Sequence, residues 1–141
     1  MNTLGLIAIF VAAGVALPGG VPGRTQKRSA ADPCASASTQ LEMNECAGRE
    51  YKKADAEMNK VYKALMAKRD LEGQGALREA QRLWLQFRDA HLQAIYPSSD
   101  PRAYGSVHPM CVAIILAQLT AERTKHLKRM LEPKEGDVCG Y

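Results

Sequence analysis

Apolar residues recur every three or four positions along three stretches of this chain, and this helical spacing limits its fold more than any other feature. The first stretch begins near Thr39, which can form a capping box with Glu42, and fades at residues 70–73. The second covers about residues 76–95, and the third covers about residues 106–132. Because no stretch alternates with a period of two for long enough to form a strand, we predict an all-α fold, a small antiparallel three-helix bundle.

The same spacing predicts which side chains face the interior of the bundle. The expected stripes are Tyr51, Ala54, Met58, Val61 or Tyr62, and Leu65 in the first helix; Leu77, Ala80, Trp84, Phe87, His91 and Ile95 in the second; and Met110, Ile114, Gln118 or Leu119, Arg123, His126 or Leu127, and Met130 in the third. Gly48 is expected to bend or break the first helix, and Gly73 and Gly75 fall in the expected linker. An extra short helix at the N-terminal end of the bundle stays open.

Residues 1–31 differ in composition from the rest and are expected to be a signal peptide, with residues 32–141 forming the folded domain. Leu4 to Leu17 is a run of 14 uncharged, mostly apolar residues. A secretory signal core needs roughly 7–15 such residues and a membrane-spanning helix about 20. We therefore expect export to the periplasm or beyond, with no membrane span after the leader is removed. An uncleaved leader that anchors the protein in a membrane is the alternative.

The net charge of +4 belongs mostly to this leader. Residues 1–31 contain three of the 19 Lys and Arg residues and none of the 15 Asp and Glu residues, so the rest of the chain has 16 basic and 15 acidic residues, a net charge of +1. A nucleic-acid-binding domain needs a basic field on its folded surface. We therefore exclude nucleic acid as a partner.

Four cysteines follow the leader: Cys34, Cys46, Cys111 and Cys139. An even number in a small exported chain indicates disulfide bonds, and four cysteines allow three pairings. Zinc sites use closely spaced cysteine pairs, whereas the spacings here are 12, 65 and 28 residues. We therefore expect structural disulfides, no bound metal and no cofactor.

Polar residues at helical spacing are expected to form a seam between the helices. The members are Asp55, Asn59, Tyr62, Gln81, Trp84, Arg88, Asp89, Thr120 and Arg123. Trp84 and Arg88 lie four residues apart, so the guanidinium can cover the indole ring while it bonds to a group of a neighbouring helix. We expect Arg88 to lock helix packing, with Asp55 and Asn59 as partners for Arg88 or Arg123. An exposed, anion-binding Arg88 is the alternative.

The turn-rich connection over residues 96–109 supplies candidate partner-binding residues. It contains Tyr96, Asp100, Arg102, Tyr104 and His108. Tyrosine and arginine are common at the centres of protein interfaces, and loops present binding residues more often than packed helix faces do. A solvated connector with two incidental tyrosines is an equally good interpretation of the same residues.

No arrangement in the sequence is typical of catalysis. Glu122 and His126 lie four residues apart, yet H-E-x-x-H is absent, as are G-x-S-x-G and a glycine-rich phosphate loop. The three histidines fall on different predicted elements. We therefore expect no catalytic residues and predict a binding or inhibitory protein rather than an enzyme.

Three motifs occur in an order that resembles the LprI-like lysozyme-inhibitor family of small envelope proteins. The first is TQLEMNEC at residues 39–46 with DAEMNKVY at residues 55–62, and the second is A-Q-x-x-W-x-x-x-R-D at residues 80–89. The third combines Gly105-Ser106 with L-T-x-x-R at residues 119–123. The resemblance covers about residues 34–131.

The resemblance implies an exported, disulfide-bonded helical domain that binds and inhibits a lysozyme-type peptidoglycan hydrolase. One alternative is an immunity protein that neutralises a cell-wall-degrading effector delivered by a rival bacterium, and another is a structural envelope protein that inhibits nothing. Family members often carry a cysteine near the place of His91, and another just before the Leu-Thr motif, about one helical turn after Cys111. The resemblance therefore favours a Cys34–Cys46 bridge and leaves the pairing of the other two cysteines open.

Overall fold

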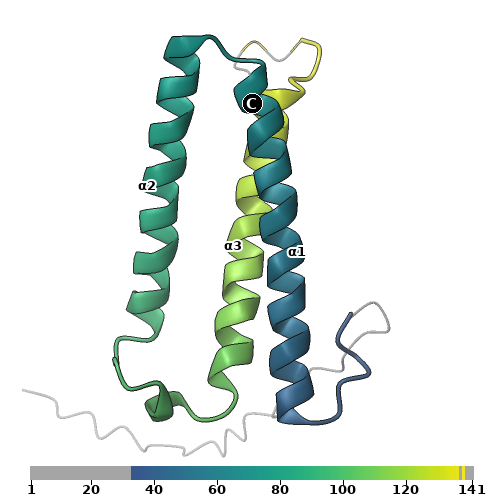
Figure 1. Ribbon diagram of the computed structural model, residues 1–141, viewed down its shortest axis with the longest axis vertical. Helices are drawn as coiled ribbons and strands as arrows, with labels where there is room; N and C mark the ends of the chain where they lie inside the picture. The colour runs from purple at the N-terminus through teal and green to yellow at the C-terminus, as the bar shows by residue number, and fades with distance from the viewer. Residues whose placement is uncertain (1–32, 137, 139–141) are drawn as a thin grey trace, which may run out of the picture.

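The computed structural model describes residues 33–136 and residue 138 (Figure 1). Three long helices, α1 (Gln40–Ala67), α2 (Leu71–Ile95) and α3 (His108–Leu131), follow one another in up-down-up order, and the short 3-10 helix η1 (Pro101–Tyr104) lies between α2 and α3. No strand occurs in the part of the chain that is described. The prediction of an all-α three-helix fold is confirmed. The expected signal peptide, residues 1–31, lies outside the described residues.

α1 begins where the sequence predicts because Thr39 and Glu42 cap it reciprocally. The Thr39 hydroxyl accepts a hydrogen bond from the Glu42 backbone N–H (3.2 Å), and the Glu42 carboxylate accepts bonds from the backbone N–H groups of Thr39 (3.0 Å) and Ser38 (2.7 Å). These bonds, that from Thr39 first, lower the pKa of Glu42 from 4.5 to about 2. The predicted bend at Gly48 is wrong, since α1 is one continuous helix and a single interior glycine costs it only about 1 kcal/mol.

α2 begins at Leu71 rather than near Ala76 as predicted. Asp70 caps the helix by accepting a hydrogen bond from the Gly73 backbone N–H (2.8 Å). Gly73 and Gly75 therefore lie inside the first turns and not in the expected linker. A good cap contributes about 1 kcal/mol, which offsets roughly half of what two helical glycines cost. Burial of the next apolar residue, Leu77, stabilises the first turns of α2 further and offsets the remaining cost of the two glycines.

α1 and α3 lie side by side and run in the same direction, whereas α2 runs the opposite way and stands further from both (Figure 1). The core lies near the end of the bundle where α1 leads into α2. There Met58, Val61 and Leu65 of α1 meet Leu77 of α2 and Leu127 of α3. Leu127 is fully buried and Leu65 is 1 % exposed. The predicted interior stripe of α1 is confirmed at its three core residues.

α3 buries only part of the predicted stripe: Leu127 is buried as expected, whereas other members are exposed. Its buried residues are Ala113, Thr120, Thr124 and Leu127. Ile114 and Met130, both in the predicted stripe, are 42 % and 39 % exposed. Small side chains allow neighbouring helix backbones to approach closely, so alanine and threonine share the inner face of α3 with Leu127. A search for large apolar residues at helical spacing finds Leu127 but misses Ala113, Thr120 and Thr124 for this reason.

The predicted stripe of α2 is confirmed at Leu77 and Trp84, which pack in or against the core, and is wrong at Phe87, His91 and Ile95. Leu77 is the only residue of α2 that is buried, while Phe87 and Ile95 are 55 % and 43 % exposed and His91 is exposed as well. Beyond the core, α2 stands away from α1 and α3 (Figure 1). The half-buried Trp84 therefore packs against the core, whereas the later residues of the predicted stripe do not.

Residues 33–36 form turns, and no extra N-terminal helix occurs in the described residues. The additional short helix is η1, which the sequence analysis had treated as loop. Asp100 caps η1 by accepting a hydrogen bond from the Arg102 backbone N–H (3.0 Å). The residue after η1, Gly105, has a φ of 70°, a conformation that favours glycine. The connection between α2 and α3 is thus a folded turn.

Candidate functional site

Four side chains form a polar cluster on the inner side of α2: Gln81, Trp84, Arg88 and Arg123, together called the Trp84 cluster. Arg123 Nε donates a hydrogen bond to Gln81 Oε1 (3.0 Å), and Gln81 Nε2 lies 3.5 Å from the Met58 sulfur. The guanidinium carbons of Arg88 and Arg123 lie 5.6 and 6.0 Å from the centre of the Trp84 ring. One indole therefore faces two cations, one from its own helix and one from α3.

Arg88 is placed for helix packing and not for binding an anion. Its side chain is only 15 % exposed. Nη1 donates to the Tyr51 hydroxyl of α1 (3.3 Å), while Nε and Nη2 donate to the Asp89 carboxylate (2.9 and 2.8 Å). The guanidinium thus ties α2 to α1 with protein acceptors. The sequence analysis assigned Tyr51 to the apolar stripe and missed its hydroxyl as an acceptor.

The other expected members of the seam lie apart from the Trp84 cluster. Asn59 donates to the Asp55 carboxylate within α1 (2.9 Å) and not to an arginine of another helix as expected. Tyr62 packs against the core. Thr120 is fully buried, and its hydroxyl has no hydrogen-bond partner among the residues described, although its carbonyl accepts a bond from Thr124 Oγ1 (2.8 Å). The expected seam is therefore one compact cluster with separate neighbours.

Three aromatic rings meet where α2 leads into α3. The ring centre of Tyr96 lies 5.0 Å from that of Tyr104 and 4.7 Å from that of His108, and the last two are 4.8 Å apart. Burial, and then the neighbouring Cys111 thiol, raise the pKa of Tyr96 above its ordinary value of 10.0. Three of the five expected partner-binding residues thus form the packed base of the connection between the helices.

The other two expected partner-binding residues, Asp100 and Arg102, face solvent. Their side chains are 52 % and 90 % exposed, and Arg102 Nε lies 3.2 Å from Asp100 Oδ1. The structure therefore divides the five expected partner-binding residues into two groups. Three aromatic rings pack together between α2 and α3, and one ion pair lies at the surface.

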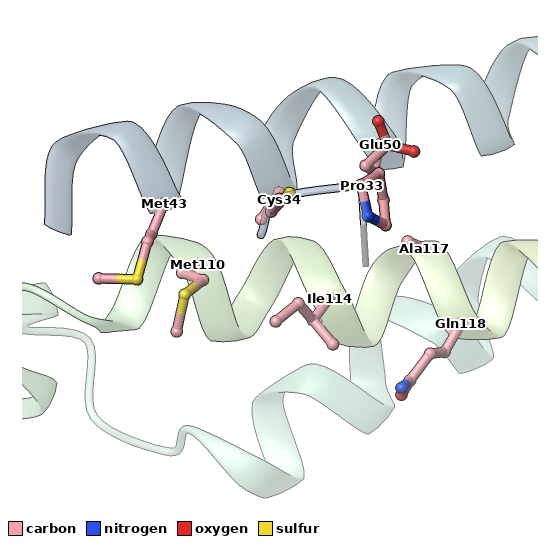
Figure 2. A pocket seen from close by; sticks show the side chains of 9 residues that line it. Pro33, Cys34, Met43, Glu50, Met110, Ile114, Ala117 and Gln118 are labelled. Atoms are coloured by element: carbon pink, nitrogen blue, oxygen red, sulfur yellow. The ribbon is translucent and has the colours of Figure 1, made fainter. Parts of the chain in front are cut away.

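A groove of about 320 Å³ lies where the segment before α1 meets α1 and α3 (Figure 2). Its lining residues are Pro33, Cys34, Met43, Ala47, Glu50, Met110, Ile114, Ala117 and Gln118. Figure 2 shows Met43 reaching from α1 toward α3 beside Met110. The sequence analysis missed this groove. Its signal was a pair of flexible methionines near the first turns of two helices, a residue type that lines adaptable surfaces.

A disulfide bond holds this segment against α1. It joins Cys34 to Cys46, with the two Cα atoms 5.8 Å apart, so the pairing that the family resemblance favoured is confirmed. Cys111 carries a free thiol in the structure, which differs from the expectation that all four cysteines are bridged. Cys111 lies in the first turn of α3, about 30 Å along the helix from its last residue, Leu131. Cys139 lies outside the described residues.

The arrangement supports binding better than chemistry. Within residues 33–136 and residue 138, no three His, Cys, Asp or Glu side chains lie close enough together to hold a metal ion. Glu122 forms an ion pair with Lys125 (2.6 Å), which lowers the pKa of this glutamate. Such a carboxylate stays ionised on a solvated helix face and is poorly suited to act as a general acid.

The fold and these surfaces together define a class of protein: a small, disulfide-linked helical bundle that offers surfaces for binding. Within that class, the chain belongs to the lysozyme inhibitor LprI family, whose family model matches residues 30–127. The chain is also 35 % identical over 115 residues to an uncharacterized protein of Rhizobium meliloti strain 1021, an alignment that covers 72 % of this chain and 81 % of that protein. No solved structure matches the chain.

In the described part of the chain, no helix combines the length and the apolar character that crossing a membrane requires. The apolar run Leu4 to Leu17 lies outside those residues. Its assignment to a signal peptide stays a prediction.

Proposed function

We propose that this protein is exported and that it binds and inhibits a lysozyme-type peptidoglycan hydrolase. The observation that carries the proposal is membership of the lysozyme inhibitor LprI family across residues 30–127, which include all three long helices apart from the last four residues of α3. The apolar leader and the Cys34–Cys46 bridge support export, because disulfides persist in oxidising compartments.

The charge of the folded part favours one kind of target. Beyond residue 31 the net charge is +1, so long-range attraction to a strongly basic lysozyme is absent. A less basic bacterial hydrolase suits this surface better, and this favours an immunity protein against a delivered cell-wall-degrading effector as the second candidate function. In both cases the protein acts by occupying an enzyme.

The test measures clearance of purified cell walls by a panel of hydrolases, in the presence and absence of the purified, oxidised protein. The panel contains egg-white lysozyme, an invertebrate-type lysozyme and several bacterial muramidases. Inhibition that rises with protein concentration and saturates near one inhibitor per enzyme supports the proposal. Full activity of every hydrolase, with no complex detected by calorimetry, rejects it. A complex without loss of activity indicates the structural envelope protein instead.

A further inference from the structure

The connection between α2 and α3 and the first turns of α3 carry few charged residues. Between Asp89 and Glu122 the chain contains only two charged residues, Asp100 and Arg102, and both lie in the connection between α2 and α3. The first turns of α3 carry none. Arg102 is therefore the one lysine or arginine between Arg88 and Arg123, and its side chain is 90 % exposed. In Figure 1 this connection lies at the lower end of the bundle, below the end of α2 and the start of α3.

The backbone that carries Arg102 is held in place. The Ser98 backbone N–H donates to the Tyr104 hydroxyl, the Ala103 backbone N–H donates to the Asp100 carbonyl (3.0 Å), and the Gly105 backbone N–H donates to the Arg102 carbonyl (3.3 Å). The rings of Tyr96, Tyr104 and His108 pack against one another and connect the segment to the end of α2 and the start of α3.

A further hydrogen bond joins this connection to α1. Asn44 Nδ2 donates to the Ser106 carbonyl (3.0 Å), across 62 positions of sequence. A segment that is already ordered loses little conformational entropy when it binds, so its contacts are converted into affinity more fully than those of a flexible loop.

The Arg102 side chain is itself directed by its neighbour. Asp100 Oδ1 accepts one bond from the Arg102 backbone N–H (3.0 Å) and one from Nε (3.2 Å). Asp100 thus engages the guanidinium through Nε. A guanidinium with a free pair of N–H donors matches a carboxylate in a planar, two-bond geometry.

Glycoside hydrolases, including lysozymes, place two carboxyl groups on either side of the bond that they cleave. The catalytic cleft is therefore the acidic feature that any such target shares, whatever its overall charge. We propose that residues 97–106 form the inhibitory surface and that Arg102 enters the cleft to bond with a catalytic carboxylate. This inference rests on the proposed function and names the surface through which it acts.

The first experiment compares single substitutions against the hydrolase that the wild-type protein inhibits in the panel above. Arg102→Ala is expected to raise the inhibition constant at least roughly tenfold, as truncation of a central interface arginine does. Arg102→Lys is expected to recover only part of the loss, because an ammonium cannot make the two-bond contact. Arg82→Ala is the matched control, since Arg82 is also exposed and ion-paired, with Glu79 on α2, and is expected to change inhibition less than twofold.

The second experiment locates the contact on the enzyme. Each catalytic carboxylate of that hydrolase is replaced in turn by its amide, and binding is measured by calorimetry. One amide variant is expected to bind the wild-type protein roughly tenfold more weakly but to bind the Arg102→Ala protein with unchanged affinity. An N-acetylglucosamine oligomer that fills the cleft is expected to compete with the wild-type protein.

The outcomes separate this inference from the function on which it rests. If the wild-type protein inhibits a hydrolase and Arg102→Ala inhibits it equally well, the proposed surface is wrong and the function stands. Equal weakening of both proteins by the amide substitutions also overturns the Arg102 contact. If the wild-type protein neither binds nor inhibits any hydrolase, both proposals fail. Circular dichroism melting confirms that each variant is folded, because both arginine side chains are exposed.

Discussion

The attachment of α2 can be tested with two substitutions of the same kind in that one helix. Leu77 is 4 % exposed and is the only buried residue of α2, whereas Leu83 is 51 % exposed. Leu77→Ala removes a side chain that meets Leu65 and Leu127 in the core, and such substitutions cost about 3 kcal/mol of unfolding free energy, within a range of about 2–5. Leu83→Ala makes the same chemical change at the surface, where about 0.5 kcal/mol or less is expected.

Thermal unfolding converts these energies into a measurable difference. For a domain of about 100 residues, 1 kcal/mol shifts Tm by roughly 4–8 °C, so Leu77→Ala should lower Tm by roughly 12–24 °C. Trp84 is the single tryptophan of the chain and lies on α2, so its fluorescence reports the contact of α2 with its neighbours while circular dichroism reports helix content. Both signals should fall together in the wild-type protein.

The reasoning is refuted if the two variants lose similar stability, or if Leu77→Ala costs less than about 1 kcal/mol. Either result would mean that α2 is not anchored through the core. A Leu77→Ala protein whose Trp84 fluorescence changes before its helix content would show that α2 separates first. That result would agree with the spacing of the three helices in Figure 1.

Two further predictions concern polar groups. Arg123→Ala should destabilise the protein by about 1–3 kcal/mol in urea unfolding because it leaves the half-buried Gln81 oxygen without its donor, and Arg123→Lys should recover less than half of that; a loss below about 0.5 kcal/mol would contradict this role. Because folding lowers the pKa of Glu42 from 4.5 to about 2, the stability that this carboxylate supplies is complete above about pH 4.5 and is lost as the pH falls toward 2. Glu42→Gln should therefore flatten the decline in Tm across that window, and identical declines in both proteins would refute the assignment.

Local sequence signals predicted the elements of this fold well because they act over a few residues. Thr39 and Glu42 are three positions apart and cap α1 as predicted. The pairing of Trp84 with Arg88 likewise follows from helical spacing within one element, and the two groups lie 5.6 Å apart. Such contacts need no knowledge of the neighbouring helix.

Contacts between helices were harder to predict because they depend on distances that no single stretch encodes. Ile114 was expected inside and is 42 % exposed, because the small residue Ala113 beside it lies on the inner face of α3. Within one helix, Gly48 was expected to bend or break α1, yet α1 continues through it, because packing along the rest of the helix outweighs the cost of one glycine. The hydroxyl of Tyr51 was overlooked as a partner for Arg88 since the two residues are 37 positions apart.

The candidate surface illustrates the same division. Composition identified the connection at residues 96–109, but could not separate Tyr96, which packs at its base, from Arg102, which reaches into solvent. Only the folded turn of η1, capped by Asp100, fixes which side chain points outward.

The close pairing of α1 with α3 also determines the order in which this chain can fold. The two helices that touch most are the first and the last, with the whole of α2 between them in sequence. Such long-range contacts give a high relative contact order for a helical protein and slow its folding. Most of the inner face of α1 has no neighbour until the C-terminal third of the polypeptide is available, because its contacts with α2 are few. For the proposed exported protein, this dependence keeps the chain open until nearly all of it has crossed the membrane.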